Sequence, residues 1–327
     1  MTITKANDLK VAIQLFGHVR SFRDTYPFLE KNILTQYDCD LFIHTWSTEE
    51  HSDPTWHQGS PDNVKKTSIE EVESLYKPKK ILIEDNDKIE HEGLFHPDKS
   101  MTLRAIKAML YSQEKVNLLR LEHQEEVTTT YDWVVTLRPD IMPLTVLDLA
   151  QFNNECTFDS KTSIHFSNGA HCHLQGTKNI YTPLASDLFV VAKPKNMNVI
   201  CSAVNEFEKY FVQFSTVNKG GISAPEASYI EYICRQGIQP RFYTFPYVVK
   251  RTLGNHHLVV GLEHRSCFKH PVEIPDFLNI ENSRRGKSIV LHYLSTSLLC
   301  KIQKETHRLI RHLGRFIDHV EAVKSSK

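Results

Sequence analysis

The chain has 327 residues, of which 40% are hydrophobic, enough for a substantial core in one large α/β domain or two smaller ones. Lys plus Arg and Asp plus Glu each number 39, so no overall positive charge favours a nucleic-acid partner. No stretch approaches the roughly 18 apolar residues of a membrane span, and the seven cysteines are widely spread without a CxxC pair. These features predict a cytoplasmic globular protein with reduced thiols and no nucleic-acid partner.

The amino-terminal third alternates strand-like and helix-like segments. Three short apolar runs have the form of buried strands, namely residues 10–16, 40–46 and 80–84. Helix-like stretches at residues 22–34 and 68–76 separate them. Because strands that alternate with helices fold into a sheet covered by helices, we predict an α/β fold with a Rossmann-like, mostly parallel sheet flanked by helices.

The middle of the chain predicts a strand that ends in a polar turn. A long helix beginning near Ser100 is followed by a strand at residues 131–137, and Pro139 prevents its regular continuation. Arg138 and Asp140 therefore stand at the carboxyl end of a buried strand. Open α/β sheets gather their ligand-binding residues at such ends.

The second half predicts strands at residues 187–192 and 288–293, helices at 196–211 and 224–235, and an extended segment at 241–249. No Gly/Ser linker divides the chain, so residues 1–295 are predicted to form one catalytic domain. Residues 296–327 carry an apolar stripe flanked by Lys and Arg, which predicts a C-terminal amphipathic helix. This helix either packs on its own domain, forms a homodimer, or lies peripherally on the inner membrane face.

Asp140 is the first candidate site residue, because a carboxylate just past a buried strand can hold a divalent cation beside a diphosphate. Negative charge develops on the phosphate of a departing nucleotide, and either Mg²⁺, Mn²⁺ or the neighbouring Arg138 would stabilise it. The alternative is that Arg138 and Asp140 form a local ion pair at a surface turn.

Two further pairs of candidates for substrate binding belong to the first two strands, one just after the first strand and one within the second. Gly17 and Arg20 come directly after the first strand, where a nucleotide can approach the backbone and a guanidinium suits phosphate. Asp40 and His44 lie on one face of the second strand. The alternatives are a turn with solvated arginines and a buried histidine satisfied by the backbone.

The remaining candidates lie in the second half. Gly221 precedes a predicted helix start at which Glu226 could serve as general base for an acceptor hydroxyl, with Asp187 as the competing base. Alternatively, Glu226 has only a structural role, in which its negative charge complements the positive end of the helix dipole. His292, at the end of a late strand, either completes a metal shell begun by Asp140 or is a satisfied core histidine.

Three segments resemble bacterial glycosyltransferases of the GT-A type that build capsules and lipopolysaccharide. They are Phe16-Gly-His-Val-Arg-Ser-Phe22 followed by Asp40-Leu-Phe-Ile-His-Thr-Trp46, then Tyr131-Asp132 with Arg138-Pro-Asp140, and more loosely Ser186-Asp-Leu-Phe-Val-Val-Ala192. The resemblance implies a nucleotide-sandwich sheet, a nucleotide-sugar donor and a divalent cation near Asp140. It also implies an order of metal motif, glycine loop, catalytic acid and late histidine, matched here by Asp140, Gly220–Gly221, Glu226 and His292. Arg138 replaces the usual first carboxylate of the metal motif.

The sequence therefore predicts a glycosyltransferase of surface polysaccharide synthesis that moves a sugar from a nucleotide-diphosphate donor to a glycan or lipid-linked glycan acceptor. Two alternatives remain open. One is a transferase of a phosphoryl or phosphoramidate group to a sugar, and the other is a non-catalytic carbohydrate-binding assembly protein.

Overall fold

The computed structural model describes residues 9–51, 64–89, 103–152, 163–167, 175–177, 180–182, 187–212, 225–243, 245–252 and 257–259. All of them belong to the first of two units of the chain, Met1–Gly261. The predicted strand at 288–293 and the predicted helix at 296–327 lie outside the described residues.

A seven-stranded sheet forms the centre of the described part. In spatial order its strands are β10 (Gln239–Tyr243), β6 (Ser163–Ser167), β9 (Phe189–Ala192), β4 (Trp133–Leu137), β1 (Lys10–Phe16), β2 (Asp38–Trp46) and β3 (Lys80–Glu84). β9 runs opposite to its neighbours β4 and β6, and the other pairs are parallel. The prediction of a mostly parallel α/β sheet is confirmed.

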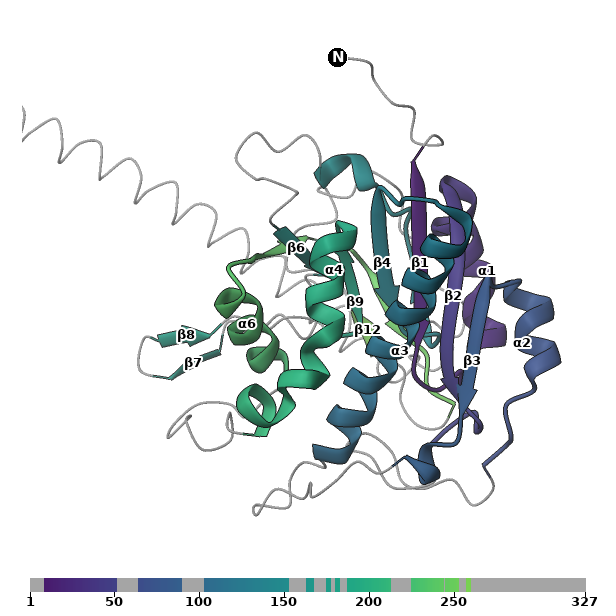
Figure 1. Ribbon diagram of the computed structural model, residues 1–327, viewed down its shortest axis with the longest axis horizontal. Coiled ribbons are helices and arrows are strands. Elements are labelled where there is room, and N and C mark those ends of the chain that lie inside the picture. Colours follow the sequence, from purple (N-terminus) through teal and green to yellow (C-terminus); the bar gives the residue numbers. More distant parts are fainter. Residues whose placement is uncertain are drawn as a thin grey trace, which may run out of the picture. The chain divides into compact units, whose positions relative to one another are not determined.

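Alternating side chains of the central strands build two apolar cores, one on each face of the sheet. On one face Ala12 and Phe42 pack with α3 (Leu103–Val127) and α4 (Pro194–Cys201), which cross in front of the sheet in Figure 1. On the other face Ile13 and Ile43 belong to a core with residues of α1 (Phe22–Asn32) and α2 (Ile69–Tyr76). Because alternate residues of a strand point to opposite faces, apolar residues at successive positions of these strands predict burial on both sides.

Local sequence accounts for where the helices begin and end. Ser68 caps α2 by accepting a hydrogen bond from the Glu71 amide, as its position before the helix predicts. The predicted helix at 196–211 is wrong in its continuity, because α4 ends at Cys201 and is followed by a 3-10 segment (Ser202–Glu206) and a π-helical segment (Glu208–Val212). The Ser202 hydroxyl donates to the Val199 carbonyl, 2.9 Å away, a local bond that competes with regular helix.

Smaller elements connect distant parts of the chain. β5 (Ile141–Pro143), β11 (Tyr247–Val249) and β12 (His257–Val259) form an antiparallel sheet with β11 in the middle. Pro143 is tolerated there because β5 is an edge strand. The other small elements are β7 (Gln175–Thr177), β8 (Ile180–Thr182), α6 (Pro225–Arg235) and the 3-10 segments Leu34–Gln36, Asn86–Lys88 and Leu149–Phe152. The pairing of β5 with β11 brings the residues after β4 next to those after β11.

Among the helices that the structure describes, none has both the length and the apolar sequence that a membrane crossing requires.

Candidate functional site

The candidate site lies at the carboxyl edge of the sheet, where β1, β2 and β4 end. The turn after β1 opens this edge at Gly17, whose φ of +86° is unfavourable for residues other than glycine. No described atom lies within 4 Å of the position that a Cβ would take there. The Gly17 amide donates to Ser112 Oγ of α3 at 2.8 Å, which fixes the turn against the helix. Gly17 thus offers backbone that a ligand can approach.

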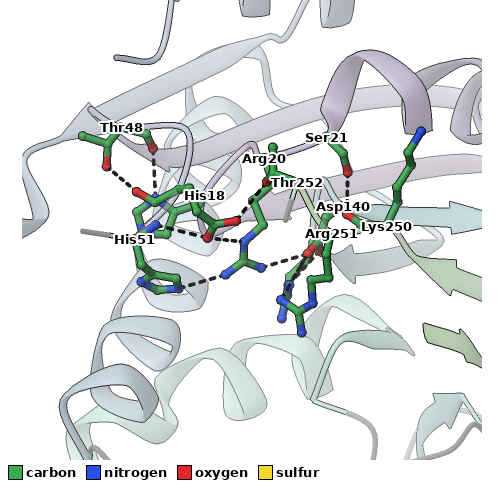
Figure 2. A network of polar contacts seen from close by, with 11 residues as sticks. His18, Arg20, Ser21, Thr48, His51, Asp140, Lys250, Arg251 and Thr252 are labelled. Atoms are coloured by element: carbon green, nitrogen blue, oxygen red, sulfur yellow. Dashed lines mark hydrogen bonds and ion pairs between the residues drawn. The ribbon is translucent and has the colours of Figure 1, made fainter. Parts of the chain in front are cut away.

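Arg20 is turned into this edge by an unusual backbone. Its φ of +48° lies in the left-handed region, which costs a non-glycine residue about 1 kcal/mol. Its amide donates to the Glu49 carbonyl at 2.9 Å. The buried guanidinium reaches three partners at 2.8 Å each: Nε meets Glu50, Nη1 meets Asp140 and Nη2 meets His51 Nε2 (Figure 2). Burial acts to lower the pKa of Arg20, but Asp140 and Glu50 outweigh it and raise that pKa.

Asp140 lies at the centre of the site and is fully buried. Arg138 forms a two-point contact with it, in which Nε donates to Oδ1 at 2.9 Å and Nη2 donates to Oδ2. Arg20 Nη1 also donates to Oδ2, and Arg251 Nη1 lies 3.7 Å from the same oxygen (Figure 2). Burial raises the pKa of Asp140 above its usual value, against the opposing effects of Arg20 and Arg251. Because both oxygens accept from guanidinium groups, which stay protonated, the carboxyl group is ionised in this arrangement.

We call Arg20, Arg138, Arg251, Asp140 and Glu50 the arginine cluster. It contains three guanidinium groups and two carboxylates, so its net charge is positive by one. The side chains of Arg138 and Arg251 are 13% and 11% exposed, whereas that of Asp140 is not exposed. The cations therefore lie nearer to solvent than the carboxylate that holds them, which makes the cluster suitable for a small anion.

Two neutral histidines border the cluster. His18 Nδ1 lies 2.9 Å from the Thr48 carbonyl, and the rings of His18 and His51 are 4.2 Å apart (Figure 2). Burial, with the nearby charge of Arg20, lowers the pKa of His18 to about 4, and burial also lowers the pKa of His51. Both rings are uncharged at pH 7 and leave the positive charge of the cluster unchanged.

Asp187 comes just before β9, whose first residues lie at the same edge because β9 is antiparallel to β4. Burial raises the pKa of Asp187 to about 6, against the opposing effect of Arg251. Such a carboxyl group can accept a proton near neutral pH. The competing base, Glu226, is the second residue of α6, and its side chain lies outside the described part.

The other predicted site residues are placed elsewhere or are not described. Asp40 lies in the amino-terminal half of β2, where Tyr131 donates to it at 2.8 Å and Lys10 is 3.2 Å away, so the structure does not bring it to the cluster. His44 is buried against α3, with its ring nitrogens 2.7 Å from Ser112 Oγ and 2.9 Å from Glu84. Gly221 and His292 lie outside the described residues.

Sequence reasoning missed Glu50, His51 and Arg251. Glu50 and His51 follow the end of β2, and Arg251 follows the end of β11. The rule that led to Asp140, namely that polar residues just past a strand gather at one edge, applies to all three. For Arg251 it requires the pairing of β5 with β11, which local sequence does not reveal. The alternative of an Arg138–Asp140 surface ion pair is half correct, because the pair exists but is buried.

The cluster does not fit the divalent cation that the family resemblance implied. Both Asp140 oxygens already accept hydrogen bonds from arginine. The described residues contain no group of three or more His, Cys, Asp or Glu side chains placed to hold a metal. A cation at Asp140 would also lie next to the guanidinium groups, which repel it.

No protein-family model matches the chain, and no curated protein matches its sequence. Among solved structures, the chain has a weak similarity to a glycosyltransferase involved in the glycosylation of the major capsid of PBCV-1, with 10% identity and a TM-score of 0.32. The match covers 72% of this chain and 80% of that one. A similarity at this level carries no argument about function.

Proposed function

We propose that the chain is a glycosyltransferase that uses a nucleotide-diphosphate sugar, with the diphosphate bound at the arginine cluster. One observation carries the proposal: guanidinium groups from after β1, β4 and β11 converge on Asp140 at the carboxyl edge of a mostly parallel sheet. This is where open α/β sheets bind nucleotides. The accessible turn at Gly17 supports the same placement, because it leaves room for a ligand beside the backbone.

The chemistry of transfer requires a cationic site at this position. As the bond between the anomeric carbon and the diphosphate oxygen breaks, its electron pair remains on that oxygen, and an acceptor hydroxyl oxygen forms the new bond to carbon. Guanidinium groups held in place by carboxylates stabilise the developing charge without reorganising, and stabilisation by such fixed groups is usually the largest single contribution to catalysis. Asp140 thus acts as a positioning residue, and Arg138 and Arg251 are the groups that meet the phosphate.

The acceptor hydroxyl must lose its proton as the new bond forms. We propose Asp187 as the base, with Glu226 as the alternative. The buried setting of Asp187 and its pKa of about 6 suit a group that takes up a proton near neutrality. The acceptor we propose is a glycan or lipid-linked glycan of surface polysaccharide synthesis, which rests on the sequence resemblance.

A donor screen tests this function. The purified chain is heated with UDP-, GDP- and ADP-sugars in separate samples, and release of the nucleoside diphosphate is followed in parallel. We expect one nucleotide class to raise the melting temperature in a concentration-dependent way, because a ligand that binds only the folded state stabilises it. If no donor shifts the melting temperature and none is cleaved, the proposal is wrong. A shift by glycans alone would instead favour a carbohydrate-binding protein.

A further inference from the structure

We infer that Arg138 and Arg251 bind the donor diphosphate in the absence of any divalent cation. The inference deepens the proposed function and rests on it. It departs from the metal that sequence resemblance led us to expect at Asp140, and it assigns Asp140 a different role, that of an anchor for arginine side chains.

Both carboxylate oxygens of Asp140 already accept hydrogen bonds from arginine. A carboxylate that ligates a metal must direct at least one oxygen at it. Here Oδ1 accepts from Arg138 Nε and Oδ2 accepts from Arg20 Nη1, at 2.9 and 2.8 Å. The carboxylate is fully buried among these donors. A metal would have to displace at least one guanidinium from it, leaving a buried positive charge beside a second cation.

The three arginines of the cluster differ in how far they are exposed to solvent. Arg20 uses Nε, Nη1 and Nη2 on Glu50, Asp140 and His51, so its role is to hold the cluster together. Arg138 and Arg251 are the partly exposed cations. With these two charges included, the arginine cluster has a net charge of plus one, which suits a diphosphate. Arginine also offers the forked donors that match phosphate oxygens.

Asp140 is buried more deeply than Arg138 and Arg251. The Asp140 side chain has no exposed surface, whereas those of Arg138 and Arg251 are 13% and 11% exposed, so an approaching phosphate meets these two donors before it meets Asp140. A metal site of the usual kind has the reverse order, with carboxylates exposed to the cation. The two-point contact of Arg138 with Asp140 fixes the plane of its guanidinium, and this orients the group for a ligand.

The test is a calorimetric titration of the wild-type chain with UDP, GDP and ADP, each in EDTA and again with Mn²⁺. We expect the dissociation constant of the preferred nucleotide to differ by less than about twofold between the two conditions. In EDTA, Arg138→Gln and Arg251→Gln should each weaken binding about tenfold or more, the effect of one lost charge-assisted hydrogen bond. Arg138→Lys, which keeps the charge but not the fork, should fall between the wild type and Arg138→Gln.

Arg235→Gln is the matched control. Arg235 is an exposed arginine in the last turn of α6, just before β10 enters the opposite edge of the sheet, so its loss should leave nucleotide affinity unchanged. Circular dichroism of each variant shows that it is folded.

The outcomes separate the inference from the proposed function. Binding that requires Mn²⁺ would overturn the inference and leave the proposed function standing. Binding in EDTA that is unaffected by all three Arg138 and Arg251 variants would also overturn it. Failure of every nucleotide to bind under both conditions would overturn the proposed function and the inference with it.

Discussion

At the scale of single residues, the site depends on charges that are buried together. Arg20 adopts a left-handed backbone conformation and contacts Glu50, Asp140 and His51 at once. Removing one partner of a buried ion pair leaves the other charge without compensation and costs about 3–5 kcal/mol. The residues that we propose to bind ligand are therefore also residues on which folding is expected to depend.

Asp140→Asn should lower the free energy of unfolding by about 3–5 kcal/mol, because it leaves three guanidinium groups with one carboxylate. Urea denaturation at pH 7 measures the change. Asp38→Asn is the control: Asp38 is 62% exposed and pairs with Lys10, and its loss should cost less than about 1 kcal/mol. Equal effects of the two substitutions would contradict the account of Asp140 as a buried anchor.

The raised pKa of Asp187 predicts that the stability of the fold depends on pH. Burial raises its pKa to about 6, so the folded protein holds this proton more tightly than the unfolded chain does. The carboxyl group therefore favours folding at low pH, and this contribution is lost as the pH rises toward and through about 6. Asp187→Asn should be about 3 kcal/mol more stable than wild type at pH 7 and little different below pH 4.

Unfolding by urea at several pH values measures this difference in stability. If Asp187 is also the base, transfer activity of the wild type rises as the pH passes through about 6. A stability difference that does not depend on pH would contradict the assignment of the proton to Asp187.

At the scale of elements, the turns after the strands decide where the site lies. β1, β2 and β4 are recognisable as short apolar runs, and polar residues after them mark the carboxyl edge. These strands can be predicted from sequence, because a strand that is buried on both faces is a nearly continuous apolar run. Strands β5, β6, β7, β8 and β12 were not predicted, because polar residues, Gly or Pro leave only short apolar stretches in them.

Gly17→Ala and Gly237→Ala form a matched pair. Both glycines have a positive φ, +86° and +74°, and neither would meet a described atom within 4 Å of an added Cβ. Each substitution should cost about 1 kcal/mol of stability from backbone strain. Only Gly17→Ala should weaken nucleotide binding, because Gly237 lies between α6 and β10 at the opposite edge. Titration of both variants checks this, and equal nucleotide affinity would remove Gly17 from the site.

At the scale of the whole described unit, the site is assembled from segments that are far apart in sequence. Gly17, Arg20 and Asp140 could be predicted as neighbours, because they follow parallel strands whose ends meet at one edge. The inclusion of Arg251 depends on the pairing of β5 with β11, which only the fold determines. Asp40 shows the opposite error, since its place on β2 was clear but its half of the strand lies away from the cluster.

The charge balance of the site could not be predicted from the sequence either. Sequence suggested Arg20 and Arg138 as separate phosphate-binding groups and Asp140 as a phosphate or metal ligand, and the structure surrounds that carboxylate with three arginines. The donors to a buried carboxylate come from segments that are far apart in sequence. The residues next to it in the chain therefore do not reveal how many donors it has. The proposed role of Asp140 therefore changes from ligand to anchor.

A crystal structure of the chain with a bound nucleotide sugar, grown in EDTA, tests the central claim most directly. The account predicts the diphosphate within hydrogen-bonding distance of Arg138 and Arg251, with the nucleotide beside Gly17 and Asp140 still held by its arginines. A donor bound anywhere other than the carboxyl edge of the sheet, or a diphosphate that touches neither arginine, would contradict it.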